Sequence, residues 1–132
     1  GGFKIQGKSL EAAKQLVEDA KAIEAAGASM VVLEGIPAKL AQVITDTINI
    51  PTIGIGAGVG CDGQVLVYQD MLGMFTDFKP KFVKVFADTG NYMKNAFTSY
   101  INEVKDGSFP AEENTYKIDD DVMLQLKEDE KL

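Results

Sequence analysis

The sequence contains no histidine and no tryptophan, all 13 of its basic residues are lysines, and it has one cysteine, Cys61. These absences exclude a Ser-His-Asp triad, a Cys-His pair and a His-ligated metal site within this chain. A single cysteine cannot form an internal disulfide, so nothing indicates an oxidising compartment. There is neither an apolar run of the roughly 18 residues that a membrane span needs nor a recognisable leader, so we expect a soluble, cytoplasmic protein.

Acidic residues are concentrated near the C-terminal end of a chain that is otherwise close to neutral. The net charge of the 132 residues is −7, and residues 112–132 hold eight acids against three lysines. Residues 1–111 carry 12 acids and 10 lysines, which gives neither the basic stripe of a nucleic-acid-binding protein nor a polybasic membrane surface. The composition, 45% apolar and 25% charged, is typical of about one globular domain, and a small neutral or anionic ligand fits this charge.

Apolar spacing and breaker residues divide the first part of the chain into helices and strands. Ser9 is a suitable N-cap, Gly27 a suitable stop, and Pro37 a suitable first residue of a second helix. The continuous apolar run that precedes Glu34 is typical of a strand covered on both faces. In chain order we predict helix 10–26, strand 30–34, helix 37–48, strand 52–57 and strand 65–68.

The second part of the chain has a helical pattern followed by an acidic extension. We predict a helical stretch with Phe82, Val83 and Phe86, and then a longer helix through Tyr92 and Val104 that Asp106-Gly107 ends. Residues 111–132 are expected to form a mostly solvated acidic tail with a short helix near residues 122–126.

The order of the predicted elements indicates an α/β fold. A helix between strands 30–34 and 52–57 predicts a right-handed βαβ unit and so a parallel sheet, with both helices on one side as in a barrel. Three parallel strands leave two unpaired edges, and a closed barrel needs about 250 residues. We therefore expect residues 1–110 to be part of a larger domain.

Residues 54–63, GIGAGVGCDG, contain a literal G-x-G-x-x-G at Gly58, Gly60 and Gly63. A dinucleotide fingerprint opens a helix whose amides face the pyrophosphate, whereas a strand-like run follows here. The alternative is that the glycines let this loop approach a neighbouring element or a ligand closely. A helix directly after Gly63 would favour the dinucleotide interpretation.

Polar groups in this loop and in the N-terminal segment GGFKIQG have structural as well as functional interpretations. Cys61 has no activating histidine, so we expect it to pack within the loop. Asp62-Gly63 is a favourable turn pair, so Asp62 is expected to shape the loop. Lys4 and Gln6 lie in a glycine-rich segment that could close over a ligand, although an exposed lysine is usually only solvated.

Glu34 is the strongest single candidate for catalysis. It ends the first predicted strand, at the sheet edge where α/β barrels place their chemistry. We expect a carboxylate there to be partly withdrawn from water and so to suit a general base. A helix-capping or salt-bridging role is the alternative.

Four segments together resemble the ketopantoate hydroxymethyltransferase family. They are GGFKIQG (1–7), VVLEGIP (31–37), PTIGIGAGVGCDGQVLVYQDMLGM (51–74), and KFVKVFADTG with SYINEVKDGSFP (81–110). The block 51–74 is the most distinctive, and only the acidic tail lies outside the resemblance. The resemblance implies a (β/α)8 TIM barrel, of which residues 1–110 are the C-terminal portion with about three βα units.

The resemblance also implies a reaction. Enzymes of this family transfer a hydroxymethyl group from methylenetetrahydrofolate to 3-methyl-2-oxobutanoate in pantothenate biosynthesis, and the glutamate that closes their sixth strand, the proton acceptor, corresponds to Glu34. They need Mg²⁺, whose ligands lie in the first half of the barrel, so we expect no metal ligand in this chain. They form large homo-oligomers, decamers in the family. Gln69 stands where family members often have histidine.

Two other functions remain open from the sequence. The chain could be a non-catalytic barrel fragment that acts only in assembly, or a phosphate- or nucleotide-binding α/β domain that uses the loop from Gly54 to Gly63. In the leading interpretation its partner is the N-terminal half of the same protein, and the fragment by itself is expected to be inactive.

Overall fold

A computed structural model describes residues 4–75 and 77–130 of the chain, which forms two compact units, Gly1–Gly90 and Asn91–Leu132. The first unit is a mixed α/β structure with a parallel sheet. The elements in chain order are α1 (Leu10–Ala25), β1 (Val31–Glu34), α2 (Ala38–Thr47), β2 (Thr52–Ile55), β3 (Gly63–Gln64), α3 (Tyr68–Met71), α4 (Thr89–Asp106), the 3-10 helix η1 (Glu112–Asn114) and α5 (Asp120–Glu130).

The two predicted helices of the first unit are confirmed, with their end signals. The Ser9 hydroxyl accepts a hydrogen bond from the Ala12 N–H at 3.2 Å and so caps α1. Gly27 has a φ of +90°, the left-handed conformation in which glycine ends helices. Pro37 differs slightly from the prediction, because it is the N-cap of α2 and the first helical residue is Ala38.

The three strands are adjacent and parallel in the order β1-β2-β3, as predicted. The predicted position of the third strand is wrong, because β3 is Gly63–Gln64 and not 65–68. The Val65 N–H still donates to the Gly54 carbonyl at 3.0 Å. Beyond that point β2 offers no partner, since Gly56 has a φ of +65° and turns the chain away. The same turn ends β2 at Ile55 rather than at residue 57.

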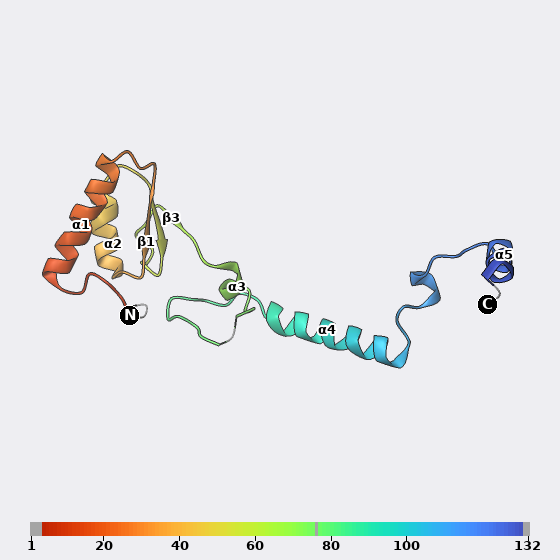
Figure 1. The fold of residues 1–132 in the computed structure, drawn as a ribbon. Coiled ribbons are helices and arrows are strands. Elements are labelled where there is room, and N and C mark those ends of the chain that lie inside the picture. The colour runs from red at the N-terminus through yellow and green to blue at the C-terminus, as the bar shows by residue number, and fades with distance from the viewer. Residues whose placement is uncertain (1–3, 76, 131–132) are drawn as a thin grey trace. The chain divides into compact units, whose positions relative to one another are not determined.

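Both helices α1 and α2 lie side by side on one face of the sheet (Figure 1). A core of small and aliphatic side chains fills the space between them and the strands. It consists of Ala20, Leu33, Ile36, Ala41, Ile44, Ile48 and Ala57. Ile44 is 1% exposed, and burial of one such side chain contributes about 1.5–3 kcal/mol to stability.

On the opposite face of the sheet, β1 exposes its side chains within the described part of the first unit. Val32 is 54% exposed, whereas its neighbour Leu33 is buried. The prediction that strand 30–34 is covered on both faces is therefore wrong for this chain. The apolar run is continuous, but only one face of it has helices against it.

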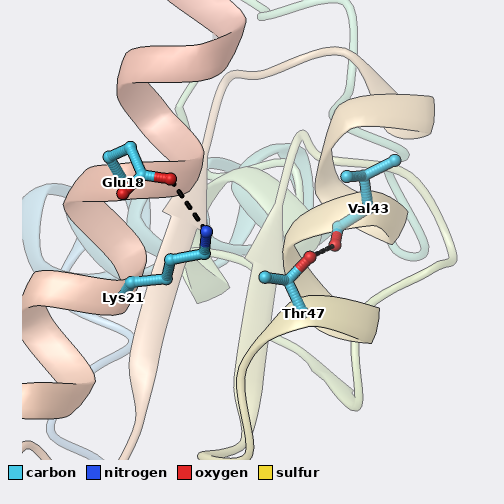
Figure 2. Close-up of polar contacts among 4 residues, drawn as sticks. All are labelled: Glu18, Lys21, Val43 and Thr47. Carbon is cyan, nitrogen blue, oxygen red and sulfur yellow. Dashed lines mark hydrogen bonds and ion pairs between the residues drawn. The ribbon is translucent and has the colours of Figure 1, made fainter.

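The helices carry polar contacts away from the core (Figure 2). On α1 the Lys21 ammonium lies 2.8 Å from the Glu18 carboxylate, an exposed pair one turn apart. On α2 the Thr47 hydroxyl donates to the Val43 carbonyl at 2.6 Å. Exposed pairs of this kind contribute at most about 1 kcal/mol, so packing on the sheet is the main source of stability of these helices.

The segment between α3 and α4 has no regular structure in its described residues, so the predicted helical stretch with Phe82, Val83 and Phe86 is wrong. In a helix each backbone N–H would donate to a carbonyl one turn earlier. Here the Phe86 N–H donates instead to the carbonyl of Met71, the last residue of α3, at 2.8 Å. Val83 is buried and its N–H closes a turn on the Pro80 carbonyl at 3.0 Å. The apolar spacing reflects this anchoring and not a helix.

The second unit is helical. The long predicted helix is confirmed as α4, and Gly107, with a φ of +79°, follows its last residue. The predicted short helix in the acidic segment is also present, although α5 extends over Asp120–Glu130. Within the described part of the chain, no helix combines the length and the apolar character needed to cross a membrane.

Candidate active site at the carboxyl end of the sheet

The carboxyl ends of β1 and β2 lie side by side. Glu34, the last residue of β1, is in register with Ile55, the last residue of β2. The Gly35 N–H donates to the Ile55 carbonyl at 2.9 Å, which continues the pairing one residue beyond Glu34. The backbone of Glu34 therefore lies between the paired strand before it and this hydrogen bond after it. Its position at the end of β1 is fixed by both.

Strand alternation decides which way Glu34 points. Leu33 belongs to the core beneath the helices, and successive side chains of a strand point to opposite faces. Val32 and Glu34 therefore lie on the face away from α1 and α2. Glu34 is exposed, so the expected partial withdrawal from water is not found in this chain. The physical reason is that, among the residues of the first unit that the structure describes, none shields this face, as the exposure of Val32 indicates.

The N-terminal segment passes beside Glu34. The Gln6 N–H donates to the Gly35 carbonyl at 3.2 Å, and the Gln6 side-chain amide donates to the Lys4 carbonyl at 3.0 Å. Gly7 has a φ of +73° and lies against Leu16 and Leu40. The structure thus brings Lys4 and Gln6 to the edge that holds Glu34, while residues 1–3 of the motif GGFKIQG lie outside the described residues.

A groove of about 360 Å³ runs between α1 and the unpaired edge of β1. Its lining is mainly apolar and includes Glu34. The residues are Gln6, Leu16, Asp19, Ala20, Ile23, Val31, Val32, Leu33, Glu34, Ile36 and Ile44. Because β1 pairs only with β2, this edge has unpaired backbone groups beside an apolar groove.

The glycine-rich loop 56–62 packs against neighbouring elements. A Cβ at Gly58 would collide with Ala38, and one at Gly60 with Gln42, both on α2. The Gln64 side-chain amide donates to the Gly58 carbonyl at 2.8 Å and holds the loop down. Among the described residues no helix opens at Gly63, where β3 begins instead. This geometry favours the packing interpretation over a phosphate cradle.

Cys61 and Asp62 lie away from Glu34. Asp62 accepts hydrogen bonds from the backbone N–H and the hydroxyl of Thr52, at 2.8 and 3.1 Å, where β2 begins. Cys61 is partly buried against the core, with its sulfur close to Gly54. Both residues have the structural roles that the sequence predicted.

Phe82 is a neighbour of the site that sequence reasoning missed. A Cβ at Gly56 would lie 2.7 Å from a carbon of the Phe82 ring, so the ring packs directly on the backbone just after Ile55. Two features of the sequence together could have indicated this contact: a glycine directly after a strand, and an aromatic residue in a loop. Such a glycine often permits close approach of another group.

No group of three or more potential metal ligands occurs in the described part of the chain. Glu34 is the acid at the carboxyl end of β1, and Mg²⁺ is usually bound through one or two carboxylates together with water and substrate oxygens. A magnesium site at Glu34 would take its remaining ligands from elsewhere.

Comparison with known proteins gives one consistent result. A sequence model of the ketopantoate hydroxymethyltransferase family matches residues 1–112. Proteins named 3-methyl-2-oxobutanoate hydroxymethyltransferase from Clostridium novyi (strain NT) and Enterococcus faecalis (strain ATCC 700802 / V583) are 63% and 64% identical to this chain over 126 residues. A third, from Clostridium beijerinckii, is 62% identical.

The match covers 96% of this chain and 46% of each of these relatives. The chain thus spans about half the length of the curated relatives it matches. A match over 126 of 132 residues also extends into the acidic segment 111–132, beyond the motifs that carried the resemblance. On this similarity, the chain belongs to the ketopantoate hydroxymethyltransferase family.

Proposed function

We propose that this chain is the C-terminal part of an enzyme that transfers a hydroxymethyl group from methylenetetrahydrofolate to 3-methyl-2-oxobutanoate, and that Glu34 is its general base. Family membership and the names of the relatives support the reaction. The observation that carries the assignment of Glu34 is its position at the carboxyl end of a parallel strand, on the face opposite the helices.

The arrangement of the first unit supports a barrel. In a (β/α)8 barrel the helices pack outside and the other face of the sheet points inward. Here α1 and α2 share one face (Figure 1). Val32 and Glu34 lie on the other face, because they alternate with the core residue Leu33. The unpaired edge of β1 and its apolar groove suit a preceding strand and helix from the N-terminal half. Residues 1–110 are then the end of the barrel domain, and residues 111–132 an acidic tail.

In this barrel Glu34 faces the interior, where the missing strands would cover it. That change explains why a carboxylate exposed in this chain can become a base in the complete enzyme. Water is removed from Glu34 only when the sheet closes, and an enclosed carboxylate accepts a proton more readily. The half chain is consequently inactive by itself in this proposal.

The chemistry assigned to Glu34 is proton transfer. Its carboxylate takes the proton from the carbon next to the keto group, and the C–H electron pair forms an enolate. The methylene carbon is bonded to two nitrogens of the folate, and both bonds break as water adds: the oxygen of water stays on the carbon, as formaldehyde, and its two protons go to the nitrogens. The enolate carbon then attacks this carbon, and its oxygen takes the proton held by Glu34 and becomes the hydroxyl group. The products are ketopantoate and tetrahydrofolate.

Magnesium, which the resemblance implies, would depend on ligands from residues outside this chain. The described residues hold no cluster that fits it, and no step above is assigned to it. The proposal also includes a homo-oligomeric assembly, which the exposed apolar side chains of α4 support. They include Tyr92, Met93, Phe97, Tyr100, Ile101 and Val104.

The test is the reaction itself, with the protein purified together with any companion chain. Intact mass would detect an N-terminal polypeptide beside the 14.2 kDa chain, and NMR would follow formation of ketopantoate from the two substrates. Product that depends on both substrates supports the proposal. A complete, folded assembly that forms no product would favour the non-catalytic role in assembly.

A further inference from the structure

Three lysines without an intervening acid stand out in a chain whose net charge is −7. Residues 78–87, FKPKFVKVFA, contain Lys79, Lys81 and Lys84 and no aspartate or glutamate. All three side chains are exposed. We name residues 79–84 the lysine segment.

The lysine segment is anchored at the carboxyl end of the sheet. The Phe82 ring packs on Gly56, the residue that follows Ile55. Val83 is 5% exposed and forms the second anchor. Since Ile55 is in register with Glu34, this contact holds the backbone of the lysine segment near the carboxyl end of β2, the edge of the sheet at which β1 ends with the proposed general base.

The ammonium groups of this segment are available to an anionic ligand. Within the described part of the chain, no ion pair joins any of the three lysines to an acid. The Lys84 ammonium lies 5.0 Å from the centre of the Phe86 ring, a cation-π contact that orients the group and leaves its charge unneutralised. Three like charges within six residues repel one another, so a multivalent anion would relieve this repulsion.

We propose that the lysine segment binds the glutamate tail of the folate cosubstrate, an inference that rests on the proposed function. The folate carbon that reacts must lie near Glu34, and the tail leads away from it with one carboxylate for each added glutamate. The keto acid offers a single carboxylate beside its reacting carbon. Several exposed, flexible lysines match the repeated charges of a polyglutamate better than one fixed carboxylate.

The test compares methylenetetrahydrofolate carrying one or five glutamates as donors for the full-length enzyme. One exposed ion pair typically strengthens binding about two- to fivefold. Replacing all three lysines (Lys79→Gln, Lys81→Gln, Lys84→Gln) should therefore raise KM for the pentaglutamate about tenfold or more, with a small effect on the monoglutamate. Added salt should likewise raise the KM of the native enzyme for the pentaglutamate more than its KM for the monoglutamate, because salt screens the ion pairs.

The matched control is Lys14→Gln, which removes an exposed lysine from α1 and should leave both KM values unchanged. An unchanged preference for the pentaglutamate in the triple variant would overturn the inference. An equal rise in KM for the keto acid would also overturn it, because the lysines would then serve that carboxylate.

A binding measurement separates this inference from the proposed function. Folic acid pentaglutamate, which carries no transferable carbon, is titrated into native and triple-variant enzyme by calorimetry. If neither enzyme forms product but only the native enzyme binds the pentaglutamate tightly, the proposed reaction is rejected and the binding role of the lysine segment is supported. Equal binding by both enzymes rejects the lysine site whatever the activity.

Discussion

Asp62 and Thr52 are linked by reciprocal hydrogen bonds between the backbone N–H of each residue and the side chain of the other. Asp62 Oδ2 accepts from the Thr52 N–H at 2.8 Å, and the Asp62 N–H donates to Thr52 Oγ1 at 3.2 Å. Thr52 is fully buried, and its hydroxyl also lies 2.8 Å from that of Thr45 on α2. Parallel strands are usually joined through a crossover helix, whereas β2 and β3 are joined by loop 56–62. These hydrogen bonds therefore help to hold β3 in register.

Asp62→Ala should lower the free energy of unfolding of the complete enzyme by about 1–3 kcal/mol. The substitution leaves the buried Thr52 N–H without its acceptor, and an unsatisfied buried polar group costs that much. Asp46→Ala is the matched control, because Asp46 is exposed and accepts only from the Gln42 side chain. Denaturant titration measures both variants. Equal losses would mean that the Thr52–Asp62 pair has no special role.

Gly58→Ala should be more damaging than Gly27→Ala by about 1–3 kcal/mol, the usual cost of overpacking. Both glycines have positive φ values, +79° and +90°, so the backbone strain is similar. They differ in surroundings: a Cβ at Gly58 would collide with Ala38, whereas one at Gly27 meets nothing within 4 Å. Thermal unfolding of the two variants gives the difference. Similar melting temperatures would contradict close packing of loop 56–62 on α2.

Glu34→Gln in the full-length enzyme should lower kcat about 10²- to 10⁴-fold, because glutamine cannot accept the proton and a positioned base contributes that much. Binding of the keto acid should change little. Exchange of the C–H proton next to the keto group of 3-methyl-2-oxobutanoate with deuterated solvent, followed by NMR, should fall in parallel with kcat.

Glu18→Gln is the control for this experiment, since it removes only the exposed pair with Lys21 on α1 (Figure 2). It should leave both rates at the native level. Exchange and turnover of Glu34→Gln within about threefold of the native enzyme would remove Glu34 from the mechanism.

Residues 1–110 expressed alone should aggregate or form a molten state. Within the described part of the first unit, Val32 on one face of the sheet is 54% exposed and β1 has an unpaired edge, and in the second unit α4 exposes apolar side chains. Exposed strand edges and large apolar patches promote association. Size-exclusion chromatography and dye binding would detect this. A monomer with a sharp, reversible thermal transition would contradict the fragment interpretation.

The sequence by itself determined the elements whose signals are local. Ser9 and Gly27 mark the ends of α1, and Gly107 follows the end of α4, because capping and a positive φ involve only nearby residues. The parallel pairing of β1 and β2 was also predictable, since the intervening helix leaves few alternatives. The position of Glu34 at a strand end follows from the same signals.

Only the tertiary structure decided where long-range contacts end or replace an element. The third strand stops after Gln64 because Gly56 turns β2 away, and residues 82–86 are not helical because Phe86 bonds to Met71. A local pattern of apolar residues does not contain these partners. The exposure of Glu34 is decided in the same way: burial depends on what covers the strand, and the described residues of the first unit put no layer over that face.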